Sequence, residues 1–231
     1  RQPMSLLRAR PHLTPSDTWQ VARRTGELDL RATLGFKRFL TRLAHARHLT
    51  ALQRAAIRQV ASWDGTAFYP DGAERSSAGA ETGNVAAPGF AILSAWFHAL
   101  ESRAAAPIFG PVVPGPNFAA GVRSFTQTPQ TTSPEFEFFD DYDAFLYKVM
   151  TGARGYHRYL GRRSAAGVSR AALDVAVAKL SSAQGRDPSR WRAAMPQIAF
   201  QSLDVADLPS VPWENRGTWG QAIALGVPRR P

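Results

Sequence analysis

The stretch PGFAILSAWFHAL at residues 88–100 predicts the centre of the core, because apolar side chains fall on nearly every face of the helix that it indicates. The side chains that give this pattern are Phe90, Ile92, Leu93, Trp96, Phe97 and Leu100. A helix that is apolar all round needs other elements to cover it. Its apolar runs are too short to cross a bilayer. We therefore expect a buried helix inside a domain, and no transmembrane segment.

The chain before this helix predicts a polar connection and another helix. Residues 71–88 are rich in Gly, Ser, Ala and Thr, which is typical of an exposed loop. Upstream, Thr50 with Gln53 three residues later suits a helix start, and the sequence Trp63-Asp64-Gly65 suits its end. Apolar positions at four-residue spacing lie between them, at Leu52, Ala56 and Val60. We expect Trp63 and Trp96 to pack in the core.

Two further helices are expected nearer the N-terminus. The sequence Thr14-Pro15-Ser16-Asp17 favours a helix start in which Asp17 reaches back to the cap, and Gly26 favours its end. Residues 28–46 then give one more helical stretch, with most of its apolar side chains near one face.

After the central helix the pattern becomes irregular before it turns helical again. Residues 108–139 are proline-rich and lack periodicity. Helical patterns follow at about residues 143–159 and from Ser169, a candidate cap, to Gly185. We divide the chain into a helical region at 1–107, an irregular loop at 108–139, a helical region at 140–200, and a turn with a strand at 211–226. The predicted class is α+β, mainly helical with at least one strand.

Composition excludes some chemistry. The sequence of 231 residues has no cysteine, so disulfides, thiolate nucleophiles and cysteine-bound zinc are excluded. The formal net charge is +10, mostly from arginine. One interpretation is a binder of nucleic acid or of a membrane surface. We favour the other, an arginine-rich chain whose partner carries the compensating acidic residues, because the basic residues are scattered along the sequence. We expect no nucleic-acid partner.

The histidines and acidic residues give only weak candidates for a site. His45 and His48 could share a helix face, but zinc needs a further ligand that the nearby sequence does not supply. The other histidines, His12, His98 and His157, are isolated. One acidic cluster could bind calcium or stabilise a following helix, and we favour the second; it comprises Glu135, Glu137, Asp140, Asp141 and Asp143. Motifs for hydrolase-fold serine catalysis and for phosphate binding are absent.

Three stretches, taken in order, resemble the penicillin acylase family. The first is LTPSDTW at 13–19, followed by Asp29-Leu30 and the Trp63-Asp64-Gly65 turn. The second is PGFAILSAWF at 88–97, and the third is NRGT at 215–218. Together they span the chain from about residue 6 to residue 225. Asn215 and Arg216 would anchor a strand through charge-assisted hydrogen bonds, with an ordinary exposed turn as the alternative.

The resemblance implies a part of a four-layer αββα N-terminal-nucleophile hydrolase. Members of that family cut themselves, which exposes a serine whose own α-amine acts as its base. The chain begins with Arg1, which cannot be that nucleophile, so we expect a piece cut from a longer precursor, the C-terminal part of the large subunit. We therefore assign no catalytic, cofactor-binding or metal-binding residue to this chain.

The expected partners are the other chains of that precursor, which are a small subunit and the chain that begins with the nucleophile. The expected substrate is a small-molecule amide, a structural calcium could lie elsewhere in the assembly, and the compartment would be periplasmic or extracellular. The alternatives are an acyltransferase or an acyl-homoserine-lactone acylase on the same fold, a non-catalytic basic binding module, and an inactive relative kept as a scaffold.

Overall fold

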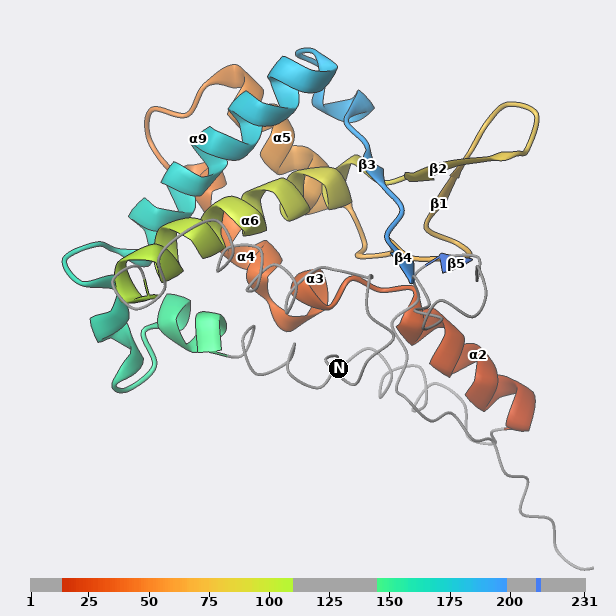
Figure 1. The fold of residues 1–231 in the computed structure, drawn as a ribbon, viewed down its shortest axis with the longest axis horizontal. Coiled ribbons are helices and arrows are strands. Elements are labelled where there is room, and N and C mark those ends of the chain that lie inside the picture. The colour runs from red at the N-terminus through yellow and green to blue at the C-terminus, as the bar shows by residue number, and fades with distance from the viewer. Residues whose placement is uncertain (1–13, 110–144, 199–210, 213–231) are drawn as a thin grey trace, which may run out of the picture.

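The computed structural model describes residues 14–109, 145–198 and 211–212, which form a group of helices with two small antiparallel sheets at one side (Figure 1). The helices are α2 (Pro15–Gly26), α3 (Leu30–Leu34), α4 (Phe36–Arg42), α5 (Ala51–Ser62), α6 (Pro88–Phe109) and α9 (Ala165–Gln184), with 3₁₀ turns η1 (Leu43–His45), η2 (Tyr156–Leu160) and η3 (Pro188–Arg190). The strands are β1 (Ala73–Arg75), β2 (Glu81–Val85), β3 (Ala193–Ala194), β4 (Gln197–Ile198) and β5 (Val211–Pro212). Residues 145–151 are also helical. None of these helices is long and apolar enough to cross a membrane.

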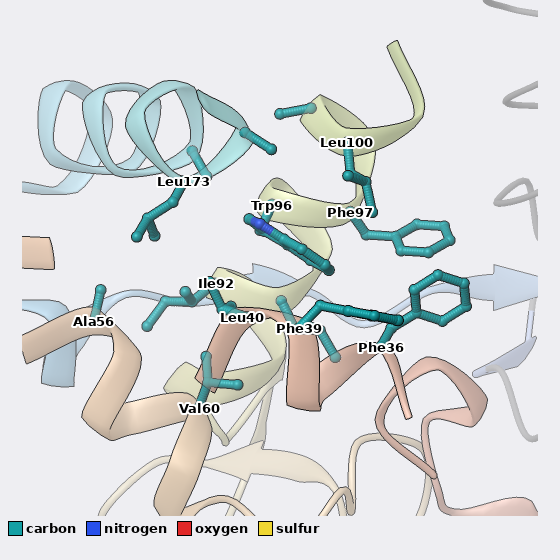
Figure 2. Close-up of a cluster of buried hydrophobic side chains, with 14 of the residues drawn as sticks. Phe36, Phe39, Leu40, Ala56, Val60, Ile92, Trp96, Phe97, Leu100 and Leu173 are labelled. Atoms are coloured by element: carbon teal, nitrogen blue, oxygen red, sulfur yellow. The ribbon is translucent and has the colours of Figure 1, made fainter. Parts of the chain in front are cut away.

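Helix α6 lies at the centre of the core, as its sequence predicts. It packs most extensively against α9 and next against α5. Side chains from α4, α5 and α9 surround it, as Figure 2 shows for Phe36, Val60 and Leu173. Trp96 has no exposed surface, and its indole Nε1 donates a hydrogen bond of 2.9 Å to the carbonyl oxygen of Ser169 in α9. The buried indole therefore has both apolar contact and a hydrogen-bond partner, as its chemistry requires.

Aromatic rings join the helices through edge-to-face contacts. The ring centroids of Phe36 and Phe97 lie 4.9 Å apart at an interplanar angle of 84°. Phe90 contacts Trp63 on one side and Phe68 on the other, with centroid distances of 6.2 and 5.8 Å. Such geometry suits the ring quadrupoles and adds to the free energy gained from burial. Trp63 is 7% exposed, so both predicted core tryptophans are confirmed.

The predicted starts of two helices are also confirmed. Thr14 and Asp17 form a capping box at α2, and Thr50 and Gln53 form one at α5. Each box satisfies two backbone N–H groups that the first helical turn leaves without partners. Helix α5 ends before Trp63, whose Nε1 donates a hydrogen bond of 2.7 Å to the carbonyl of Thr66.

Three helical predictions were wrong in their boundaries. The stretch 28–46 is broken at Gly35, whose φ of 108° ends α3 and starts α4. The segment 143–159 is helical only to residue 151, because Gly152 and Gly155 take φ values of 68° and 87° that a helix cannot contain. Helix α9 is capped by Ser164 instead of Ser169, and it ends at Gly185 as predicted.

The expected loop at residues 71–88 contains the hairpin of β1 and β2. Ala73 pairs with Val85 and Arg75 with Glu81, and β3 adds a third antiparallel strand through Ala193 opposite Val85. Most side chains of these strands are exposed or half-buried. The sequence therefore lacks the apolar alternation by which a half-buried strand is recognised.

Two further regions of the prediction lie mostly outside the described residues. Helix α6 continues to Phe109, so the described chain is still helical where the irregular segment at 108–139 was expected to begin. Of the strand region at 211–226, the structure describes residues 211–212, which form β5 and pair with β4. The division into these regions stays a prediction.

Replacing Trp96 with alanine should lower the free energy of unfolding by about 3–5 kcal/mol, because it leaves a cavity and a carbonyl without its donor. Urea unfolding followed by far-UV circular dichroism measures this change. Trp19→Ala is the matched control, since Trp19 lies on α2 and is 58% exposed. We expect it to change the free energy by no more than about 0.5 kcal/mol. Equal stability of the two variants would contradict the central position of Trp96.

Gly89→Ala should separate α5 from α6. A Cβ atom at position 89 would lie 2.6 Å from Cβ of Trp63 and 3.0 Å from the carbonyl oxygen of Gln59. Because the helices must move apart, we expect a loss of about 1–3 kcal/mol in the free energy of unfolding. Gly167→Ala is the control, since its Cβ would meet only the Ser164 hydroxyl, at 3.1 Å. If the Gly89→Ala protein were as stable as the wild type, the contact of residue 89 with Trp63 and Gln59 would be able to adjust, which would contradict this prediction.

Candidate functional site

The histidines that the sequence singled out do not form a metal site in the described residues. His45 lies in η1, and His48 follows it with a positive φ of 66°; both side chains are exposed. The possibility that they share the face of one helix is therefore wrong, and both are surface histidines. Nowhere in the described ranges do three His, Cys, Asp or Glu side chains gather closely enough to bind a metal.

Of the other candidate residues from the sequence, the structure describes some and not others. His98 lies on α6, with its Nδ1 3.6 Å from Oε2 of Glu101, which is buried. Within the described chain, the other carboxylate oxygen of Glu101 has no hydrogen-bond partner. The acidic cluster at 135–143, Asn215 and Arg216 fall outside the described residues, as does His12.

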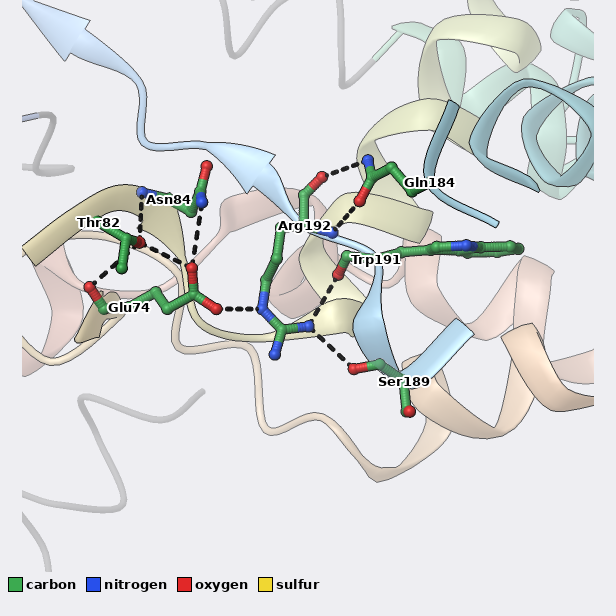
Figure 3. Close-up of polar contacts among 7 residues, drawn as sticks. All are labelled: Glu74, Thr82, Asn84, Gln184, Ser189, Trp191 and Arg192. Atoms are coloured by element: carbon green, nitrogen blue, oxygen red, sulfur yellow. Dashed lines mark hydrogen bonds and ion pairs between the residues drawn. The ribbon is translucent and has the colours of Figure 1, made fainter. Parts of the chain in front are cut away.

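A polar constellation of the described residues lies where β1, β2 and β3 meet, and its centre is Glu74 (Figure 3). Oε1 of Glu74 accepts a hydrogen bond of 2.6 Å from Nε of Arg192. Oε2 accepts bonds of 2.7 Å from Oγ1 of Thr82 and 3.1 Å from Nδ2 of Asn84. The donors come from β2 and from the chain just before β3, so one carboxylate joins the hairpin to the third strand.

Arg192 is fixed by more than its ion pair. Its Nη1 donates to the carbonyl oxygens of Ser189 and Trp191, at 2.9 and 3.1 Å. Its backbone N–H and carbonyl are both bonded to the side chain of Gln184, the last residue of α9, at 2.7 and 2.8 Å. Because the guanidinium is held from several directions, it is preorganised for the carboxylate of Glu74.

The donors around Glu74 determine its protonation. The hydrogen bond from Thr82, followed by those from Arg192 and Asn84, lowers the pKa of Glu74 below its ordinary value. A carboxylate whose two oxygens accept three such bonds is a poor general base, because it would have to give them up to take a proton. We infer that this site joins segments of the fold and does not carry out proton transfer.

A second charged site is buried beneath α6. Asp29 caps α3 and binds the guanidinium of Arg31, and the two residues are 1% and 9% exposed. Nη2 of Arg31 also donates a bond of 3.0 Å to Oγ of Ser94 in α6. The guanidinium carbon lies 5.6 and 5.4 Å from the ring centroids of Phe90 and Phe97. The burial of this ion pair is offset by hydrogen bonds and by cation–π contact.

Lys37 lies in a third charged site, which is partly buried. Its ammonium donates to the carbonyl oxygen of Trp63, just after α5 ends, and burial lowers its pKa, partly opposed by Asp64. A cation next to the last carbonyls of a helix is a common stabilising arrangement. Its partner is a backbone group of its own fold, so Lys37 does not stand out as a nucleophile.

Sequence reasoning missed Glu74, Arg192 and Arg31 as members of polar sites. Glu74 and Arg192 are far apart in the sequence, and each alone has the pattern of a surface charge. Asp29 lies in a stretch that carried the family resemblance, and the proximity of an acidic and a basic residue at 29 and 31 was the one signal available. That this chain carries no catalytic, cofactor or metal residue stays a prediction.

Comparison with known proteins finds a likeness in fold. A thermostable penicillin G acylase from Alcaligenes faecalis matches with a TM-score of 0.63 and 20% sequence identity. The match covers 94% of this chain and 39% of the acylase chain, so this chain spans well under half the length of that protein. At this identity the likeness shows the fold alone. No protein-family model and no curated protein matches the sequence.

The donors on Glu74 predict a pH dependence. Its pKa is depressed in the folded protein, so its ionised form stabilises the fold above the ordinary value of 4.5 and stops doing so as the pH falls through the folded pKa. We expect Glu74→Gln to be less stable than the wild type at about pH 7 and the difference to shrink by about pH 3. Urea unfolding at a series of pH values measures it. Thr18→Ala, which removes an exposed hydroxyl of α2, is the control. A difference that grows on acidification would have the wrong sign.

Proposed function

We propose that this chain is a scaffold-forming part of an acylase-like amidohydrolase with a four-layer αββα fold. The observation that carries the proposal is the likeness of fold to penicillin G acylase over 94% of this chain. The stretches at 13–19, 63–65 and 88–97 support it, because they follow one another in this order along the chain. Within the described residues they begin α2, follow the end of α5 and begin α6, the helix at the centre of the core.

In this proposal the attacking group comes from a part of the protein outside this chain. The reaction is hydrolysis of an acyl–amide bond by a residue at the start of a processed polypeptide, with its own amine as base. The described carboxylates at positions 29 and 74 are already bonded to several donors, which fits a role in holding the fold. The chain would contribute a rigid wall against which the catalytic part is positioned.

The assembly, its substrate and its compartment follow from the same proposal. The partners are polypeptides cut from the same precursor, including one that begins with the nucleophile, and the substrate is a small amide with an apolar acyl group. A periplasmic or extracellular location and a calcium ion elsewhere in the assembly complete the proposal. Transfer of the acyl group to an amine in place of water would require no change in this chain.

Purification of the native assembly tests the proposal. Intact-mass measurement and N-terminal sequencing of everything that co-elutes with this chain should reveal a polypeptide that begins with Ser, Thr or Cys. The assembly should hydrolyse an arylamide of an apolar carboxylic acid, and an added amine should show whether acyl transfer competes. Replacement of that first residue with alanine is the control and should abolish turnover.

Two results would overturn the proposal. Turnover by the purified 25.2 kDa chain alone would show that it carries its own nucleophile. An assembly with a Ser-initiated partner but no turnover of any amide would indicate an inactive relative that keeps the fold as a scaffold.

A further inference from the structure

One stretch of the described surface combines exposed arginines with a cluster of aromatic rings. It lies before α9, in the turns around η2 and the adjacent helical residues 145–151. We call it the Arg–Tyr surface, and it consists of Phe145, Lys148, Arg154, Tyr156, Arg158, Tyr159, Arg162 and Arg163. All five of its cations are exposed, and Tyr159 is 41% exposed. Residues 145–173 contain no Asp or Glu, so the local charge is entirely positive.

The aromatic rings of this surface support one another. The centroid of Phe145 lies 5.2 Å from Tyr159 and 5.8 Å from Tyr156, with tilts of 67° and 65°. The ammonium of Lys148 lies 5.4 Å from the centroid of Tyr156. The rings are therefore held in place by edge contacts before any partner arrives.

The backbone that presents the arginines is also fixed. Leu160 is 5% exposed and anchors the turn in the core. Its carbonyl oxygen accepts a bond of 3.1 Å from Nε of Arg163, while Nη1 of Arg163 donates to the carbonyl of Arg103 on α6. Arg103 and Arg163 line one side of an open hollow of about 240 Å³ next to the start of α9. A surface that is already ordered loses little conformational entropy on binding.

The described carboxylates do not neutralise these cations. The ion pairs of arginine within the described residues involve Arg23, Arg31, Arg75 and Arg192, none of which belongs to the Arg–Tyr surface. Guanidinium groups bind carboxylates through paired hydrogen bonds, and Arg and Tyr are enriched in the energetically important parts of protein interfaces. The surface thus has the composition of one half of a protein interface, and its charge would be complemented by an acidic partner.

We propose that the Arg–Tyr surface docks an Asp- and Glu-rich face of a partner polypeptide. That the partner is the polypeptide completing the amidohydrolase assembly rests on the function proposed above; the acidic chemistry of the partner does not. A single-stranded nucleic acid fits less well, because stacking needs free ring faces. Lys148 lies over the face of Tyr156, which also makes an edge contact with Phe145 and a tilted contact with Tyr159. Of these three rings, only that of Tyr159 is exposed.

Fluorescence anisotropy with a labelled poly-glutamate peptide tests this proposal on the full chain. The test variant is Arg154→Gln/Arg158→Gln/Arg162→Gln, which removes three exposed cations and leaves the bonds of Arg163 intact. The matched control is Arg54→Gln/Arg58→Gln/Arg186→Gln, three exposed arginines elsewhere. Each triple variant lowers the formal charge from +10 by three, to +7, so non-specific attraction changes equally. Circular dichroism checks that both variants are folded.

We expect the peptide to bind the wild type, and its Kd to rise roughly tenfold in the test variant and by less than about twofold in the control. Equal weakening by both variants would overturn the proposal, because binding would then depend on net charge alone. Absence of binding to the wild type at low salt would also overturn it, because the surface would then not attract an acidic chain. Tighter binding of a labelled oligothymidylate of matched charge would assign the surface to nucleic acid instead.

One more variant distinguishes a partner from the chain itself. It neutralises the acidic cluster to Gln or Asn at Glu135, Glu137, Asp140, Asp141 and Asp143. If the peptide binds this variant and not the wild type, the cluster of the same chain occupies the surface and the partner proposal falls. These titrations measure binding and not hydrolysis, so their failure leaves the proposed hydrolysis standing, and an inactive assembly leaves the docking surface standing.

Discussion

The structure depends on the burial of one helix whose surface is apolar on almost every side. Helix α6 would expose apolar side chains on almost every face if it stood alone in water, so α4, α5 and α9 must cover it. Trp96 and Phe97 are the largest fully buried side chains that α6 contributes. Close approach is part of this arrangement, because Gly89 leaves room for Trp63. The core is continuous through all four helices, and most of the energy of the fold follows from apolar area removed from water.

Two polar sites join segments of the fold to each other through hydrogen bonds and ion pairs. The Asp29–Arg31 pair joins the short helix α3 to Ser94 on the central helix, and Glu74 joins the hairpin to the strand that follows α9. Both sites connect segments that are distant in sequence, and both engage their carboxylates with several donors. In the described residues, these charges therefore serve the architecture, while Arg154, Arg158 and Arg162 of the Arg–Tyr surface form no ion pair with a described carboxylate.

Much of the helical core was predictable from the sequence, because burial leaves a pattern along one chain. The capping boxes at Thr14 and Thr50, the end of α9 at Gly185, and the burial of Trp63 and Trp96 all follow from local rules. The hairpin was missed because its strands are polar on both faces and gain their order from Glu74 and from β3. The polar sites were missed because ion pairs such as Glu74–Arg192 leave no local periodicity. The Arg–Tyr surface was missed although its residues lie close together in the sequence, at 145–163, because the basic residues were treated as scattered along the whole chain.

The pairing of α6 with α9 has a consequence for how the chain is made. Residues 110–164 lie between the two helices, so a ribosome releases α6 well before α9 exists. At roughly 5–20 residues per second, the face of α6 that later receives Leu173 and Ser169 stays open to solvent for several seconds. A nascent chain with such an exposed apolar face is prone to aggregation until the partner helix has been made.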